Sequence, residues 1–94
     1  MGELPAIALL ESTHHFPGPY MFKVIGRPEN GFVARAVAAV RDALDEQTDP
    51  PFKVRETPAG RHVSVTVTPM VQRAEQVLAV YRRVKTMDGL VMLW

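Results

Sequence analysis

The sequence predicts a single α+β domain in which two helices cover one face of a four-stranded antiparallel sheet. Segments with strand-like alternation and segments with helical spacing follow each other in the order β-α-β-β-α-β. The 94-residue chain is long enough for one hydrophobic core, and its composition, 47% hydrophobic and 22% charged, is ordinary for a globular protein. Two amphipathic helices and four short strands each need a covered face, and stacking them in two layers buries both.

Residues 1–18 read as an N-terminal arm, and residues 19–94 as the domain. Four apolar residues of the arm are spaced to pack a short helical turn onto the domain: Leu4, Ile7, Leu9 and Leu10. The following stretch, STHHFPGP, contains two prolines and a glycine and is expected to be irregular.

The first strand is predicted at residues 20–26, YMFKVIG, which is rich in aromatic and β-branched residues and ends in glycine. A helix is predicted from about Asn30 to Gln47, with Asn30 as the N-cap that accepts a free N–H of the first turn. Its apolar stripe consists of Val33, Val37, Val40 and Leu44.

The second half of the chain predicts a hairpin, a helix and a last strand. Residues 52–57 alternate, PAGR supplies a tight turn, and GRHVSVTVT returns as the second strand of the hairpin. Thr68 and Pro69 suit the N-cap and first position of a helix that runs to about Met87, with Gly89 as its C-cap. The helix is expected to bury Ala74, Val77, Leu78, Tyr81 and Val84. The closing LVMLW is the last strand.

This order of elements is that of the ferredoxin-like βαββαβ sandwich, whose right-handed crossovers predict the strand order 4-1-3-2. The helices are expected to cover the sheet face with Phe22, Val24, Phe52, Val54, Val63, Val65 and Val67. The opposite, open face is then expected to carry Met21, Lys23, Ile25, Lys53, Arg55, His62, Ser64, Thr66 and Thr68.

Three stretches stand together between about Leu9 and Trp94: LLE…FPGPYMFKVIG, GRHVSVTVT and EQVLAVYRRV. Through these stretches the chain resembles the YbeD-like family of small bacterial proteins. The resemblance implies a ferredoxin-like fold similar to the regulatory ACT domains of amino-acid metabolism, and a proposed regulatory part in lipoate metabolism. It implies no catalytic residues. STHH looks like an insertion before the Phe-Pro pair, so His14 and His15 inherit no role.

The open face is the first candidate site, with Lys23, Lys53, Arg55, His62, Ser64 and Thr66 as residues that face a partner. Hydroxyls beside three cations suit an anionic ligand or an acidic protein surface. The alternative is that this face meets only water, as polar faces of antiparallel sheets commonly do.

The loop GRPENG, between the first strand and the first helix, is the second candidate. ACT domains often bind effectors at this loop, and the helix N-terminus that follows offers free N–H groups to an anion. Arg27 and Asn30 are then the expected effector contacts. The loop lacks the G-x-G-x-x-G spacing, and an ordinary connector is the alternative reading.

The last strand is the third candidate, because an apolar edge strand invites pairing with another chain. Leu90, Met92 and Trp94 are the residues expected at such an edge, and a homodimer through this edge or the open face is a hypothesis. Asp42, Asp45, Glu46 and Asp49 form an acidic helix end, which is either solvated or a patch for a basic partner.

Several chemistries are not expected. The chain has no cysteine, and two adjacent histidines, whose side chains point apart in an extended chain, do not suggest a metal site or cofactor. His62 and Ser64 lie about 6.6–6.8 Å apart along a strand, too far for a direct hydrogen bond. RNA-binding modules on this fold stack bases on aromatic side chains, and the outward positions considered above offer only His62.

The sequence therefore predicts a non-enzymatic regulatory or adaptor module that binds a protein partner or a small effector. A small enzyme on a ferredoxin-like scaffold is the alternative, and a nucleic-acid-binding domain is a weaker one, because the net charge is only +1. No apolar run reaches the length that spans a bilayer, and a bacterial cytoplasmic location is expected.

Overall fold

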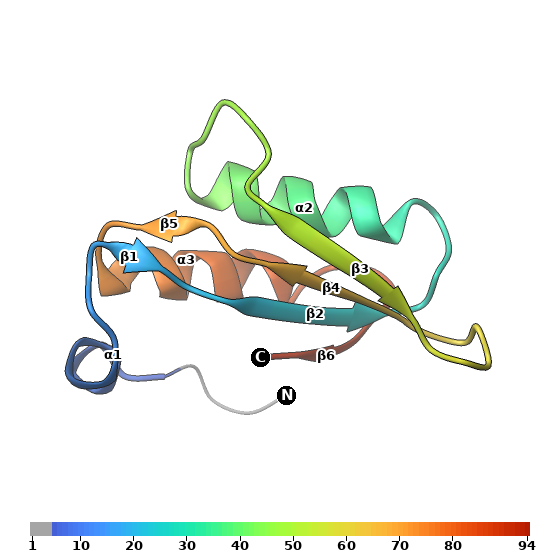
Figure 1. Cartoon of the computed structure of the whole chain (residues 1–94), viewed down its shortest axis with the longest axis horizontal. Helices are drawn as coiled ribbons and strands as arrows, with labels where there is room; N and C mark the ends of the chain where they lie inside the picture. The colour runs from blue at the N-terminus through green and yellow to red at the C-terminus, as the bar shows by residue number, and fades with distance from the viewer. Residues whose placement is uncertain (1–4) are drawn as a thin grey trace.

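Four strands form the central sheet of the computed structural model, which describes residues 5–94. Their order is β3 (Phe52–Glu56), β4 (Val63–Val67), β2 (Phe22–Gly26) and β6 (Leu90–Leu93), and all neighbours are antiparallel. In chain order these are the second, third, first and fourth of the predicted strands, so the predicted order 4-1-3-2 is confirmed. Figure 1 views this sheet from its open side.

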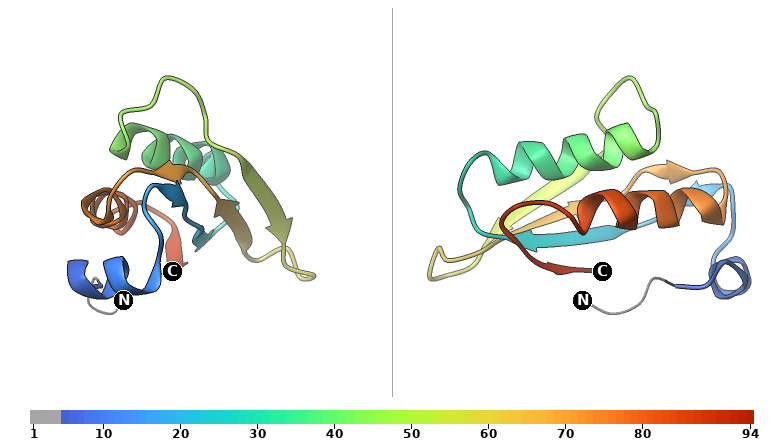
Figure 2. Two further views of the ribbon diagram at one scale, coloured as in Figure 1. Left: turned by 60° about the vertical axis from the view of Figure 1, so that its left-hand side comes forward. Right: turned by 180° about the vertical axis from the view of Figure 1, so that it is seen from behind.

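Two helices, α2 (Phe32–Ala43) and α3 (Ala74–Val84), lie together on the other side of the sheet, as Figure 2 shows. The predicted ferredoxin-like, ACT-like fold class is therefore confirmed. The two central strands and the helices supply most of the fully buried side chains: Phe22, Val24, Val65, Val67, Val40, Val77, Val80 and Val84. Val80 was missing from the predicted stripe of its helix.

The helices do not cover the whole face that the sequence assigned to the core. Phe52 and Val54 of β3 remain 45% and 46% exposed, and every residue of β3 is exposed. They share a side of the sheet with buried neighbours, because Val54 pairs with Val65 and Phe52 with Val67. The expectation that both were covered is wrong, because β3 projects beyond the helical layer (Figure 2).

Helix α2 begins and ends at different residues from those predicted for the helix at 30–47. Its N-cap is Gly31, which has a φ of 65° and makes no side-chain capping bond, whereas Asn30 has a φ of 55°. Asn30 is therefore part of a left-handed turn before the helix. The helix ends at Ala43, and Asp45, with a φ of 55°, turns the chain away before Gln47.

Helix α3 also starts later than predicted, because a short extra strand occupies its predicted first turn. Strand β5 (Met70–Val71) pairs antiparallel with β1 (Gly18–Pro19), and the Tyr20 N–H donates to the Pro69 carbonyl. These bonds hold residues 69–71 extended, so Thr68 and Pro69 do not begin the helix.

The C-terminal end of α3 also differs from the prediction. The helix stops at Val84, with Lys85 as its C-cap, and not at Met87. Two backbone bonds, from Thr86 to Arg83 and from Met87 to Val84, tighten the chain beyond it. Gly89, with a φ of 86°, leads into β6 and does not cap the helix.

The N-terminal segment forms a short helix, α1 (Ile7–Thr13), which packs against α3. Leu10 is buried and Ile7 packs beside it, as the apolar spacing predicted, whereas Leu9 is 56% exposed. Leu4 lies outside the described residues.

Candidate protein-binding face

The open face is built from two rows of side chains that cross the whole sheet. The pairing register aligns Lys53, Thr66 and Lys23 in one row, and the same row reaches Trp94 through backbone hydrogen bonds with Lys23. The second row consists of Arg55, Ser64, Ile25 and Met92. Five of the residues predicted for this face therefore lie next to one another: Lys23, Lys53, Arg55, Ser64 and Thr66.

The chemistry of the two rows changes in steps across the sheet. The β6 side is apolar, with Met92 and Trp94 each 50% exposed, and the β3 side carries the exposed cations Lys53 and Arg55. Half-buried hydroxyls of β4 separate them. Such a surface offers an apolar anchor at one end and charge recognition at the other, as the core and rim of protein interfaces do.

Trp94 is held in place although it follows the last residue of β6. Its N–H donates to the Lys23 carbonyl at 2.9 Å, and its own carbonyl accepts from the Lys23 N–H. The Lys23 ammonium lies 5.6 Å from the centre of the Trp94 ring, within cation–π range. A tryptophan fixed by its backbone loses little freedom on binding, and such residues dominate binding energy at interfaces.

All charges at the outward positions of this face are positive. Within the four described strands, these positions hold Lys23, Lys53 and Arg55 and no carboxylate. Glu56, the only acidic residue in these strands, pairs with buried Val63 and so lies on the helix side. The face therefore complements an acidic surface, even though the net charge of the chain is only +1.

A β-bulge in β6 separates the three residues that the sequence grouped as an edge. Gly26 pairs with Leu90 and Ile25 with Met92, so Val91 is an extra residue and the alternation breaks there. Leu90 consequently packs against the core, whereas Met92 and Trp94 belong to the open face. Simple alternation over LVMLW could not reveal this, because the bulge depends on pairing with β2.

Arg35, a residue that the sequence pattern did not single out, fixes the loop that contains the two effector candidates, Arg27 and Asn30. Arg35 of α2 donates to the carbonyls of Asn30 (2.9 Å) and Asp88 (3.0 Å), and thereby ties the loop to the turn before β6. Arg27 forms an exposed ion pair with Glu29 at 3.0 Å. Its backbone N–H donates to the Gly89 carbonyl.

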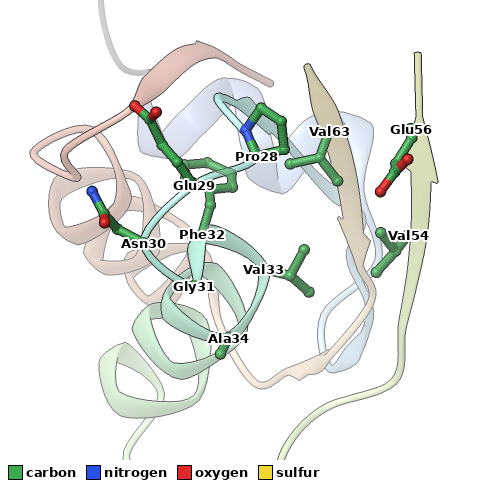
Figure 3. A pocket seen from close by; sticks show the side chains of 10 residues that line it. All are labelled: Pro28, Glu29, Asn30, Gly31, Phe32, Val33, Ala34, Val54, Glu56 and Val63. Atoms are coloured by element: carbon green, nitrogen blue, oxygen red, sulfur yellow. The ribbon is translucent and has the colours of Figure 1, made fainter. Parts of the chain in front are cut away.

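A pocket of about 530 Å³ lies between this loop, the start of α2 and strand β3 (Figure 3). Val33, Val54 and Val63 form its apolar lining. Asn30 lines the pocket, together with Glu29 and Glu56, whereas Arg27 is not among its lining residues. Glu29 is already paired with Arg27, so Glu56 is the pocket carboxylate outside that ion pair. An acidic group beside an apolar lining suits an apolar or cationic group better than the anion expected at this loop.

The acidic residues at the end of α2 are partly neutralised. Arg41 forms ion pairs with Asp42 at 3.0 Å and with Asp49 at 2.9 Å, and hydrogen bonds to these carboxylates raise the pKa of Arg41. Asp45 and Glu46 line a second pocket with Gln72 and Gln76 near the start of α3. This acidic end therefore lies close to the start of α3.

Four aromatic rings, those of His14, Tyr20, Phe22 and Tyr81, form a cluster that the sequence pattern did not predict. The rings of His14 and Tyr20 are 4.7 Å apart, and those of Tyr20 and Phe22 are 4.8 Å apart. Tyr81 contacts Phe22 edge-on, and its hydroxyl lies 3.3 Å from that of Tyr20. Burial, and then the hydrogen bond with Tyr20, raise the pKa of Tyr81 well above its usual range.

His62 and Ser64, and the histidines and carboxylates of the described chain, are the remaining candidates for catalysis or metal binding. No hydrogen bond joins the side chains of His62 and Ser64 within residues 5–94; instead, the His62 backbone bonds with the Thr57 hydroxyl. The same residues contain no group of three histidines or carboxylates placed to hold a metal ion. Among the helices of this range, none is long and apolar enough to cross a membrane.

Comparison with known proteins identifies a family and a relative of the same fold. The family model described as "Protein of unknown function (DUF493)" matches residues 11–94. The chain is also similar to the solution structure of protein HP0495 from H. pylori, with a TM-score of 0.61 and 15% sequence identity. This similarity covers 100% of the present chain and 98% of the other, and it shows a shared fold alone. No curated protein matches the sequence.

Proposed function

This chain belongs to the DUF493 family of proteins of unknown function, and we propose that it is a non-enzymatic regulatory or adaptor module. In this proposal its open sheet face binds an acidic surface of a partner protein. One observation carries the proposal: half-exposed Met92 and Trp94 share their two rows with Lys23, Lys53 and Arg55, and the outward positions of the four described strands hold no acidic side chain.

The proposal assigns separate roles to the two ends of the face. Trp94 and Met92 are the apolar anchors, and Lys53 and Arg55 attract and orient the acidic partner. The fold supports a regulatory role, because ACT-like domains commonly serve regulation. The resemblance to YbeD-like proteins adds a bacterial cytoplasmic setting and lipoate-related metabolism to the proposal, and a small effector at the pocket beside Asn30 is compatible with it.

Affinity capture from native cytoplasm, read by mass spectrometry, tests this function with three baits. The wild-type chain is compared with Lys53→Glu/Arg55→Glu and with Arg73→Glu/Arg82→Glu, which makes the same change in net charge at exposed residues away from the sheet. We expect one set of acidic partners to be lost from the first variant and kept by the second.

Direct binding of a captured partner then tests the chemistry. Its affinity is expected to fall as salt rises, because counterions screen the contacts, and to fall at least about tenfold in Trp94→Ala. A partner that binds the face variant and Trp94→Ala as well as wild type contradicts the proposal. If wild type captures nothing distinct, a protein partner is contradicted, and thermal-shift screening of amino acids and lipoate-related acids becomes the test of an effector.

A further inference from the structure

Within residues 5–94, strand β3 forms one edge of the sheet and pairs on one side only, with β4. The Thr68 N–H donates to the Pro51 carbonyl, and the Thr57 N–H donates to the His62 carbonyl, so Pro51 and Thr57 direct their backbone groups toward β4. Antiparallel pairing alternates this direction along a strand. Phe52, Val54 and Glu56 therefore direct their N–H and C=O groups outward, to the free edge.

The same three residues place their side chains beside the pocket between β3 and α2. Val54 and Glu56 line it, across from Val33, as Figure 3 shows, and Phe52 continues the apolar row on β3. Phe52 and Val54 are almost half exposed, although their side of the sheet is the core side. A strand added at this edge would cover both and would bring its own side chains to the pocket.

The two sides of β3 differ in charge, and this difference determines which strand fits. On the open face, Lys53 and Arg55 point outward as cations; on the pocket side, Phe52 and Val54 are apolar and Glu56 is acidic. We propose that β3 accepts an extended segment of another protein by strand addition, in which apolar residues alternate with Asp or Glu. The acidic residues lie opposite Lys53 and Arg55, and the apolar ones reach the pocket.

A second copy of the same strand does not satisfy this requirement. In a two-fold antiparallel pairing centred on Val54, Lys53 of one copy lies opposite Arg55 of the other. Centring on Lys53 or on Arg55 places that cation opposite its own copy. Like charges directly opposite destabilise a strand pair, so the edge disfavours its own duplicate and favours an acidic strand.

This site goes beyond the proposed function, because it uses the backbone edge and the pocket and does not need Met92 or Trp94. A partner on the open face and a strand at the β3 edge can therefore be tested separately, although Lys53 and Arg55 border both.

The test uses a peptide whose sequence is chosen from the register of strand pairing with β3. An antiparallel partner strand pairs its first residue with Glu56 and its fifth with Phe52, which gives Lys-Glu-Val-Glu-Val, flanked by serines and capped at both ends. The probe is titrated into the full-length ¹⁵N-labelled protein. We expect saturable shifts and slowed hydrogen exchange at the amides of Phe52, Val54 and Glu56.

Two control peptides define the specificity. Shuffled Val-Val-Lys-Glu-Glu has the same composition without alternation, and Lys-Lys-Val-Lys-Val reverses the charges that face the cations. Both are expected to bind at least about tenfold more weakly. Equal binding of the shuffled peptide, no binding of the probe, or shifts centred on β6 would overturn the proposal.

Two further changes test the backbone bonds themselves. Val54→Pro removes an outward N–H without removing a bond to β4, and proline is tolerated at such edge positions. It is expected to abolish binding while the spectrum stays folded. A probe N-methylated at its central valine removes the reciprocal bond of the same pair, from the probe's N–H to the Val54 carbonyl. It is tested with the wild-type protein, so the proposal remains falsifiable if the proline variant unfolds.

The outcomes also separate the two proposals. Trp94→Ala is expected to leave probe affinity unchanged, whereas it weakens a partner on the open face. If the N-methylated probe binds as well as its parent, strand addition is overturned. If the β3 amides are protected in concentrated protein and lose that protection on dilution, a second copy occupies the edge and the proposal is overturned.

Discussion

Gly26 ends β2 directly against the buried ring of Phe32, the first residue of α2. A Cβ at this position would overlap the ring, so only glycine allows the helix to begin so close to the sheet. The packing of this one pair places the loop with Arg27 and Asn30, and also one wall of the pocket beside β3. The sequence suggested only that Gly26 ends a strand, because the ring that excludes other residues is brought there by the fold.

Gly26→Ala is expected to lower the free energy of unfolding by about 1–3 kcal/mol, the usual range for overpacking a core. Denaturant titration at neutral pH measures it. Adding Gly26→Ala to a Phe32→Leu background should cost less than adding it to wild type, because the ring has been removed. Equal costs in both backgrounds would contradict the steric explanation.

Ionisation of Tyr81 is expected to make the free energy of unfolding depend on pH. Burial raises the pKa of Tyr81 in the folded protein above about 10, its ordinary value. Between these two pKa values the phenol is ionised in the unfolded chain and neutral in the folded one, so the unfolded chain binds fewer protons. The stabilisation that the neutral phenol contributes is therefore complete below about pH 10 and is lost as the pH rises above it.

Tyr81→Phe is expected to flatten this loss. Denaturant titrations at about pH 8 and about pH 11 should show a smaller drop in unfolding free energy for the variant than for wild type. Groups that are present in both proteins contribute to both drops, so their contribution cancels when the two drops are compared. An equal drop in both proteins would contradict the assignment to Tyr81.

At the scale of single elements, the two edge strands of the sheet differ in how they are protected. Strand β6 contains a bulge at Val91, and bulges of this kind discourage further pairing. Strand β3 is regular over its five residues and is exposed throughout. Its Lys53 and Arg55 discourage pairing with an identical strand. The regular edge is therefore selective in its partner, and the other edge is irregular.

The incomplete cover over β3 predicts a contrast between two valines that pair with each other. Val65→Ala, at a fully buried site, is expected to cost about 2 kcal/mol or more, and Val54→Ala less than about 1 kcal/mol. Denaturant midpoints of the two variants measure the contrast. Equal costs would mean that β3 is covered as well as β4.

At the scale of the whole molecule, the distribution of charge matters more than its sum. The net charge is +1, yet the cations of the sheet gather on the open face while acidic residues border the pocket and the end of α2. A homodimer remains a prediction, and two open faces that met would bring cations together. Such a dimer should respond to salt in the opposite way to a complex with an acidic partner.

Light scattering at micromolar concentration tests this difference. A dimer through the open faces is expected to become more populated as salt rises from about 50 to about 500 mM, because screening weakens the repulsion between cations. Arg73→Glu/Arg82→Glu should not alter the trend, whereas Lys53→Glu/Arg55→Glu should reduce it. A mass of 10.5 kDa at both salt concentrations would contradict the dimer.

The sequence by itself determined the class of fold, the order of the strands in the sheet and the side of each central strand that enters the core. Periodicity carries this information, because alternation and helical spacing are local, and few arrangements bury every apolar face. The valines of GRHVSVTVT are buried as their alternation predicted. The charges of Lys23, Lys53 and Arg55 were likewise assigned to one surface from local pattern.

Only the tertiary structure decided how far the helices reach and where the pattern breaks. The exposure of Phe52 and Val54 depends on the width of the helical layer, and the separation of Leu90 from Met92 depends on pairing between distant strands. The later start of α3 depends on β1 and β5, which lie about 50 residues apart along the chain. These features depend on contacts between distant segments, and together they produce the two surfaces proposed to bind partners.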